Sequence, residues 1–114
     1  MGYPASSMPE DLKMECVYIC RGYRRRKRAL ARRLLSIAQD APAAARYRAD
    51  PEVQKLLAVQ AALDAYPEDG ALLLDSITGQ IPYEHLDPPM CRQLFYHRRR
   101  EFLQTVARTL GYWH

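Results

Sequence analysis

The C-terminal segment 88–110 constrains the fold most, because it combines a helical period with two faces of different chemistry. At about 100° per residue, one face is apolar. It carries Cys91, Phe95, Phe102, Val106, Leu110 and Trp113, with Leu103 at its edge. The opposite face carries Gln93, Tyr96, His97, Arg100, Gln104 and Arg108, with Glu101 as the nearby acid. We expect the aromatic face to pack on the rest of the chain, which leaves the cationic face to meet an anionic partner.

The elements expected before this segment follow the order of a helix-turn-helix. Residues 68–77 have a helical pattern, and Gly79 is a natural stop after them. Pro82 is expected to open a short helix at 83–86. Asp87 is expected to cap the long helix, with the following prolines in its first turn. A helix, a tight link, a short helix, a turn and a long cationic helix are typical of a DNA-reading helix-turn-helix.

Two long helices are predicted upstream. Residues 10–40 keep helical spacing of their apolar residues, although Gly22 costs about 1 kcal/mol relative to Ala and leaves a bend open. Residues 50–66 begin with Asp50 as a cap and Pro51 in the first turn. We expect the two helices to pair as an antiparallel hairpin, joined by an Ala-rich connection.

No strand-like alternation appears in the 114 residues, so the predicted fold class is all-α. Residues 1–9 are expected to be a flexible tail, in which Ser7 forms a capping box with Glu10. The remainder, 10–114, is expected to be a single helical domain with the hairpin at 10–66 and the helix-turn-helix at 67–114.

Charge is segregated along the chain. Residues 1–48 carry 11 basic and 4 acidic side chains (+7), residues 49–87 carry one basic and 8 acidic (−7), and residues 88–114 carry 5 basic and one acidic (+4). Such segregation indicates either that the ends dock on the middle or that the partner is anionic.

The strongest basic cluster is a run of five cations. It consists of Arg24, Arg25, Arg26, Lys27 and Arg28. Five consecutive residues cover the whole circumference of a helix, so some of these side chains must extend along the hairpin. Two interpretations stay open: the cluster grips phosphates, or it is a solvated face that forms ion pairs with Glu52, Asp64 or the acidic loop.

The residues predicted to contact DNA lie on the last helix, 89–110. Gln93, Tyr96, His97 and Arg100 share the exposed face of its first turns, where recognition helices meet base edges. Glutamine suits adenine and arginine suits guanine in the major groove. The residues expected to reach sideways to phosphates are Arg92, Arg98 and Arg99. The alternative is an ordinary exposed helix that is rich in arginine.

Two stretches carry a resemblance to known families. Residues 75–86 (DSITGQIPYEHL) with 95–103 (FYHRRREFL) resemble region 4 of sigma-70 factors, and more closely the small phage and mobile-element transcription regulators of the ArpU and RinA kind. In those families a Gly ends the first helix, a Glu-rich short helix follows, and a (Phe/Val)-Tyr-Arg-x-Arg-(Arg/Lys) run opens the recognition helix. Residues 23–30 (YRRRKRAL) are similar to the Tyr-x-x-x-Lys-x-(Arg/Lys)-(Ile/Leu) segment of ArpU-like proteins. The resemblance implies a phage-related transcription regulator.

Other classes of protein find little support in the sequence. Cys16 and Cys20 lie one turn apart, but Cys91 and the histidines follow no metal-ligand pattern, so we expect buried thiols and no metal. No nucleophile stands with a base and an orienting group, so we expect neither an enzyme nor a cofactor. Three cysteines, no signal peptide and no apolar run of the ~20 residues that span a bilayer lead us to expect a cytoplasmic protein without a membrane partner.

The sequence therefore predicts a small all-α regulator that binds double-stranded DNA with its last helix, and that could form a homodimer through the hairpin. The alternative from another class is a helical adaptor that binds RNA polymerase, a phage packaging component or another protein through the same basic surfaces. A third possibility is a module in which the 24–28 cluster binds an acidic partner. The target site, and whether transcription rises or falls, are not encoded in these patterns.

Overall fold

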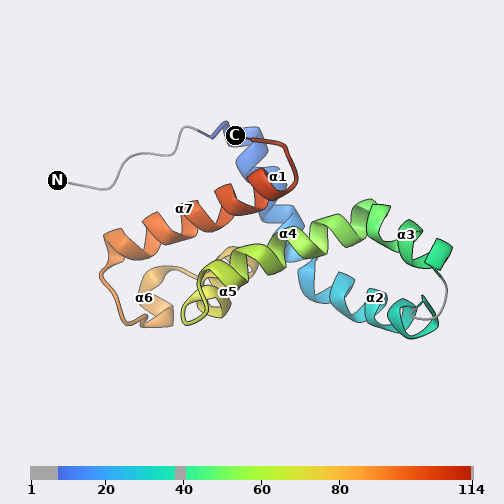
Figure 1. Ribbon diagram of the computed structural model, residues 1–114. Helices are drawn as coiled ribbons and strands as arrows, with labels where there is room; N and C mark the ends of the chain where they lie inside the picture. Colours follow the sequence, from blue (N-terminus) through green and yellow to red (C-terminus); the bar gives the residue numbers. More distant parts are fainter. Residues whose placement is uncertain (1–7, 38–40, 114) are drawn as a thin grey trace.

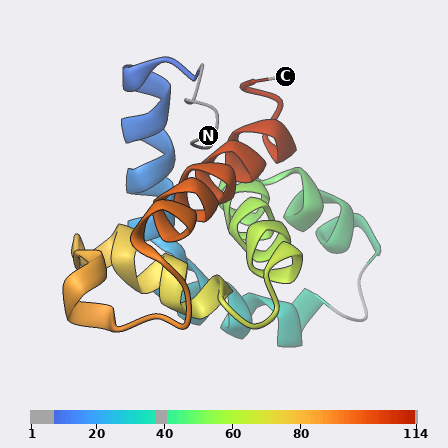
Figure 2. The ribbon, with the colours of Figure 1, turned by 90° about the vertical axis from the view of Figure 1, so that its left-hand side faces the viewer.

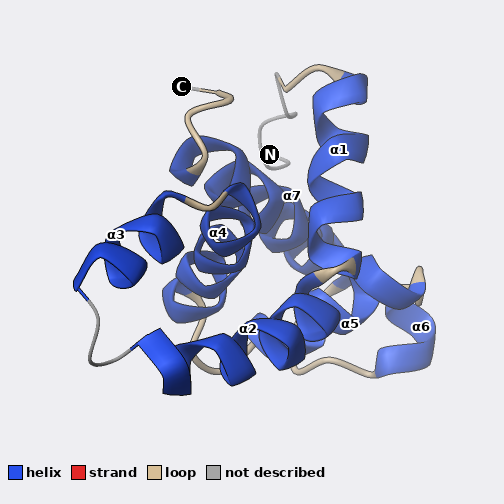
Figure 3. Cartoon of the chain, turned by 90° about the vertical axis from the view of Figure 1, so that its right-hand side faces the viewer, coloured by secondary structure: helices blue, strands red, loops and turns tan. Residues whose placement is uncertain are grey.

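In the computed structural model, which describes residues 8–37 and 41–113, the predicted first helix is divided at Gly22. Helix α1 spans Glu10–Arg21 and helix α2 spans Tyr23–Ile37. In Figure 3, α1 stands upright while α2 runs across below it. The single straight rod allowed by the pattern is thus replaced by an elbow.

Arg26 explains why the elbow needs a glycine. Its guanidinium folds back from α2 and donates to the backbone oxygen of Ile19 in α1 at 2.8 Å. A Cβ atom at Gly22 would lie 2.5 Å from the Arg26 Nη1 atom. Only the missing side chain at Gly22 therefore leaves room for Arg26 to bridge the two helices.

The N-terminal expectations are met only in part. Helix α1 begins at Glu10 with Pro9 as its N-cap and no side-chain cap hydrogen bond, so the predicted capping box does not start the helix. Ser7 and the rest of the segment 1–7 lie outside the described residues. Met8, which was assigned to the tail, is buried against the core.

The predicted Ala-rich connection is wrong, because it contains a helix. Helix α3 spans Ala41–Ala49. Alanine has the highest helix propensity, and Pro42 lies in the first turn, where its missing N–H has no intrahelical partner to lose. Helix α4, Pro51–Ala65, begins as predicted: the Asp50 side chain accepts a hydrogen bond from the Glu52 backbone N–H at 2.9 Å.

The N-terminal helices do not form the predicted two-helix hairpin. Helix α2 packs on α4, with α3 inserted between them in the chain, whereas α1 packs mainly on α5 and α7. Figure 1 shows α2 and α3 on one side of α4, and α5 to α7 on the other. Tyr23 joins the α2–α4 pair by donating to the Gln60 side chain at 2.6 Å.

Helices α5 (Gly70–Gly79) and α6 (Tyr83–Leu86) lie close to where the sequence predicts them. The turn between them differs in detail, because the left-handed residue is Gln80, with φ 52°, and not Gly79. The buried Ser76 fixes this turn: its hydroxyl donates to the Ile81 oxygen at 2.8 Å, and its own backbone oxygen accepts from the Ile81 N–H at 3.1 Å.

Helix α7 begins later than predicted, spanning Arg92–Thr109 with Cys91 as its N-cap. Asp87 is therefore not the cap; it adopts a left-handed conformation with φ 45°. Asp87 is the C-cap of α6, and residues 88–91 separate it from the start of α7. These residues form a non-helical connection with a bend at Pro89 and Met90, and Pro88 is buried in it.

The core forms around α7, which contacts α1, α4, α5 and α6. Figure 2 shows α7 crossing in front of α4, with α1 beside it. As predicted, Phe95, Phe102 and Val106 are fully buried, each contributing about 1.5–3 kcal/mol through the apolar surface it removes from water. Cys91, which was placed on the same stripe, is exposed because it precedes the helix, and Ala107 is buried instead.

Candidate nucleic-acid interface

The uncovered side of α7 holds part of the predicted DNA-contact set. Gln93 is exposed, and His97 and Arg100 are partly exposed. Tyr96 is partly buried: its ring packs edge-on against Phe95 with ring centres 5.2 Å apart, and its hydroxyl accepts a hydrogen bond from the Tyr83 N–H at 3.2 Å. Tyr96 thus has a packing role as well as an accessible edge.

Two of the predicted DNA-contact residues form ion pairs within the chain, and a third lies beside a carboxylate. Arg92 lies 2.8 Å from the Glu84 carboxylate of α6. Arg98 pairs with Asp69, which precedes α5, so this pair ties α7 to the α4–α5 loop. His97 lies 3.0 Å from Glu101 one turn later. Neither the partners Glu84 and Asp69 nor their distances can be read from helical periodicity.

The remaining two arginines, Arg99 and Arg100, have no carboxylate partner among the described residues. The Arg99 guanidinium lies over the Tyr96 ring, 5.9 Å from its centre. Partial burial lowers the pKa of Arg99 below its ordinary value. Arg99 is therefore a partly desolvated cation whose charge no acid of the described chain neutralises.

These two arginines line a groove between α1 and α7, which we call the α1–α7 groove. One part of it, of about 240 Å³, is lined by Lys13, Tyr96, Arg99, Arg100 and Leu103. A second part, of about 370 Å³, shares Lys13, Tyr96 and Arg99 and extends to Arg21 and to the α5–α6 turn at Gln80. Lys13 and Arg21 were not predicted as site residues, and no signal in the sequence places α1 against α7.

The side chains of the predicted phosphate-binding cluster at 24–28 point to different parts of the structure, and some of them are paired within the chain. Arg24 pairs with Asp75 of α5. Arg26, whose side chain is 11% exposed, donates to Glu52 at 2.6 Å. The Lys27 ammonium lies over the Tyr23 ring, 5.8 Å from its centre.

The other side chains of this region remain at the surface. Arg25, Arg28 and the following Arg32 are exposed and form no ion pair with any described residue, and their spacing places them on one stripe of α2. We call these three the α2 arginine stripe. Of the ion pairs proposed from the sequence, the one to Glu52 is formed, whereas Asp64 accepts a hydrogen bond from Gln60 at 3.0 Å.

Cations of α2 lower the pKa of two carboxylates at the start of α4. The Arg26 hydrogen bond holds the pKa of Glu52 below its ordinary value, and the Arg33 hydrogen bond does the same for the pKa of Asp50. On the opposite side of α4, burial raises the pKa of Tyr66 to about 12, with a smaller contribution from the neighbouring Glu101. All these groups keep their ordinary charge at neutral pH, so the surface potential there is constant.

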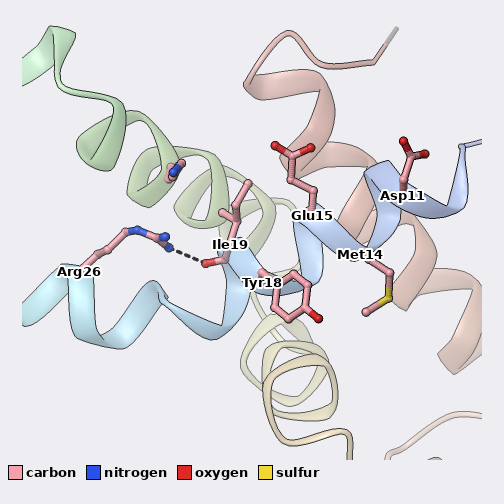
Figure 4. A pocket seen from close by; sticks show the side chains of 7 residues that line it. Asp11, Met14, Glu15, Tyr18, Ile19 and Arg26 are labelled. Atoms are coloured by element: carbon pink, nitrogen blue, oxygen red, sulfur yellow. Dashed lines mark hydrogen bonds between the residues drawn. The ribbon is translucent and has the colours of Figure 1, made fainter.

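The pocket at the α1–α2 elbow has a mixed lining. Figure 4 shows Asp11, Met14, Glu15 and Tyr18 along α1, and the Arg26 side chain of α2 reaching the Ile19 oxygen. The pocket measures about 470 Å³, and Lys55 completes its lining. Both of its cations pair with Glu52, so the pocket offers no cation that lacks a carboxylate partner.

The two cysteines of α1 lie in the core, as predicted. Cys16 and Cys20 are buried, and burial raises their pKa to about 11 and about 12. Within residues 8–37 and 41–113, no group of three or more His, Cys, Asp or Glu side chains is placed to hold a metal ion. In the same residues no helix is both long enough and apolar enough to cross a membrane.

Comparison of the chain with protein-family models, curated proteins and solved structures gives no match.

Proposed function

We propose that this protein is a small DNA-binding regulator that presents α7 to double-stranded DNA. One observation carries the proposal: α7 buries Phe95 and Phe102 in the core, while Arg99 and Arg100 line a groove beside them without a carboxylate partner in the described chain. Cations left unneutralised by their own chain favour a polyanion, because each phosphate that they contact releases counterions.

Roles within α7 follow from its contacts. Gln93 and Arg100 project from the uncovered side and are the residues proposed to meet base edges, where glutamine suits adenine and arginine suits guanine. His97 lies between them on the same side and is oriented by Glu101. Arg92 and Arg98 hold α6 and the α4–α5 loop against α7, and thereby set the position of the helix on DNA.

Three further parts of the proposal concern the biological setting. The resemblance of the stretches 75–86 and 95–103 to ArpU- and RinA-like regulators supports a role in transcription of phage or mobile-element genes, in the cytoplasm where DNA is accessible. The α5–α6–α7 order supports a helix-turn-helix of that kind. Leu57 of α4, which is 52% exposed, supports dimerisation through the α2–α4 pair, and two copies would read two half-sites.

The direct test is fluorescence anisotropy with a labelled duplex of random sequence, titrated with protein at several KCl concentrations. We expect binding whose affinity falls steeply with salt, and which Arg100→Ala weakens. Arg25→Ala removes an exposed arginine from α2, which does not pack on α7, and serves as the matched control. Selection of duplexes from a random pool then gives a consensus site. Absence of duplex binding at low salt would refute the proposal.

A second candidate function is a helical adaptor that binds an acidic surface of RNA polymerase or of another protein. The α2 arginine stripe supports it, because α2 packs on α1, α3 and α4 but not on α7, so the stripe is a basic surface separate from the proposed DNA-binding helix. Changing Arg25, Arg28 and Arg32 together to glutamine separates the two functions. The adaptor proposal expects loss of partner binding with the α7 surface intact, whereas the DNA proposal expects most duplex affinity to remain.

A further inference from the structure

The α1–α7 groove gathers cations from two helices that are distant in the sequence. Lys13 and Arg21 come from α1, and Arg99 and Arg100 come from α7. The one acid in the lining is Glu10. Its side chain is 77% exposed and lies 4.0 Å from the Lys13 ammonium, at the limit of an ion pair. The groove therefore carries an excess of positive charge.

Arg99 shows that this charge is held in place and not merely scattered over the surface. A guanidinium stays protonated in proteins, so Arg99 cannot relieve partial burial by losing its proton. Partial burial of a charge is unfavourable unless an opposite charge accompanies it. The Tyr96 ring offers a weak interaction in its place. An anion bound in the groove would supply the missing partner.

Tyr96 adds a hydrogen-bond donor. Its hydroxyl oxygen already accepts from the Tyr83 N–H at 3.2 Å, so the phenol is held in one orientation. No hydrogen bond donated by this hydroxyl is formed within the described chain, and Tyr96 lines the groove together with Lys13 and Arg99. Two cations and one oriented hydroxyl are a suitable set of donors for phosphate oxygens.

We propose that the α1–α7 groove binds a phosphate group, with Lys13 and Arg99 gripping it from opposite helices and Tyr96 donating a hydrogen bond. The inference rests on the proposed function in one respect: the phosphate is assigned to the sugar–phosphate backbone of the bound duplex. The groove is open and partly apolar, with Leu103 and Met14 in its lining, and this suits a passing backbone with its sugars better than a small free anion. Helix α1 thus becomes part of the DNA-binding surface.

The test is the salt dependence of duplex binding by Lys13→Gln, Arg99→Gln and the double variant. The slope of log affinity against log salt falls by about 0.9 for each phosphate contact that is lost. Because both residues bind one phosphate, we expect the double variant to lose about 0.9 of slope in total, and neither single variant to lose more than that. Arg25→Gln, a control on α2, removes the same charge outside the groove.

Several outcomes overturn the inference. Unchanged slopes in all three groove variants show that no phosphate binds there. A loss of about 1.8 in the double variant shows two separate phosphates and not one shared grip. Thermal unfolding checks that each variant folds, and Arg99→Lys, which keeps the charge, is expected to retain the full slope if Arg99→Gln proves unstable.

Failure of the groove and failure of the proposed function are distinguishable. If the wild-type protein binds duplex while the groove variants keep the full slope, DNA binding stands and the groove assignment falls. If the wild-type protein binds no duplex, inorganic pyrophosphate is added in a thermal-shift assay. A rise in Tm for the wild-type protein but not for Arg99→Gln supports a phosphate site with another source of ligand. If pyrophosphate does not raise the Tm of the wild-type protein, the proposed phosphate site in the groove is overturned as well.

Discussion

The Arg26 bridge across the α1–α2 elbow leads to a sharp prediction about stability. Arg26→Ala removes a charged donor from the Ile19 oxygen, a hydrogen bond worth about 1.5–3 kcal/mol when the donor is ionised. It also removes the ion pair to Glu52, whose side chain is 49% exposed, so that solvent limits this part to about 0.2–1 kcal/mol. We therefore expect the free energy of unfolding to fall by about 2–4 kcal/mol.

Gly22 makes the prediction more specific through a double-mutant cycle. In the wild-type background, a Cβ at Gly22 would lie 2.5 Å from the Arg26 Nη1 atom and would push the guanidinium off the Ile19 oxygen. We expect Gly22→Ala to lower stability there by about 1 kcal/mol, since the lost hydrogen bond outweighs the gain in helix propensity. In the Arg26→Ala background the obstacle is gone, and the same change is expected to raise stability by about 0.5–1 kcal/mol.

Urea unfolding, followed by far-ultraviolet circular dichroism, measures all four corners of the cycle. Arg25→Ala is the matched control, because Arg25 is exposed, adjacent and without an ion pair in the described chain, and is expected to stay within about 0.5 kcal/mol of wild type. The reasoning is refuted if Arg26→Ala unfolds like Arg25→Ala, or if Gly22→Ala has the same effect in both backgrounds.

Three further predictions test other parts of the structure. In the native protein Cys91 is expected to react with a thiol reagent at pH 8. Cys16 and Cys20, whose pKa values are raised to about 11 and about 12 by burial, are expected to react only after denaturation. Rapid reaction of all three thiols in the native protein would contradict the described packing. Glu52→Gln is expected to lower stability at neutral pH, and this loss is expected to vanish as the pH falls below 4.5. The reason is that a carboxylate whose folded pKa lies under its unfolded value stabilises the fold only while it is ionised. Urea unfolding at several pH values measures the difference between the variant and the wild-type protein, and a difference that grows in acid would contradict the pair with Arg26. Gln80→Gly removes the side chain from a residue with left-handed backbone geometry, and is expected to raise stability by about 0.5–1 kcal/mol in thermal unfolding. A loss of stability would contradict the left-handed conformation of residue 80.

Local signals were sufficient where neighbours in the sequence make the interaction. The Asp50 cap and Pro51 open α4 as predicted, since both act on N–H groups of the same turn. Phe95 and Phe102 are buried as predicted, since seven residues bring a helix back to nearly the same face. The short helix α6 was likewise predicted at its observed bounds from Pro82.

Local signals misled where two of them competed. The Ala-rich stretch that contains Pro42 was predicted to be a connection, but it forms α3, with the proline accommodated in the first turn. Asp87 precedes a proline as Asp50 does and has the chemistry of an N-cap, yet it ends α6 as a left-handed C-cap, and α7 begins only at Arg92. Gly22 is compatible with both a straight helix and an elbow, and the choice depends on Arg26 finding the Ile19 oxygen and Glu52.

The sequence by itself determined that this chain is helical, that the aromatic side of its last helix is buried, and that its positive charge is concentrated in two stretches. These are properties of periodicity and composition, which operate within a few turns of one helix. Only the tertiary structure decided which of those charges are neutralised. It paired Arg92 and Arg98 with acids of other elements, and it placed Lys13 of α1 beside Arg99, which kept its charge without a carboxylate partner. Electrostatic pairing depends on distances through space, and these are set by how the helices pack.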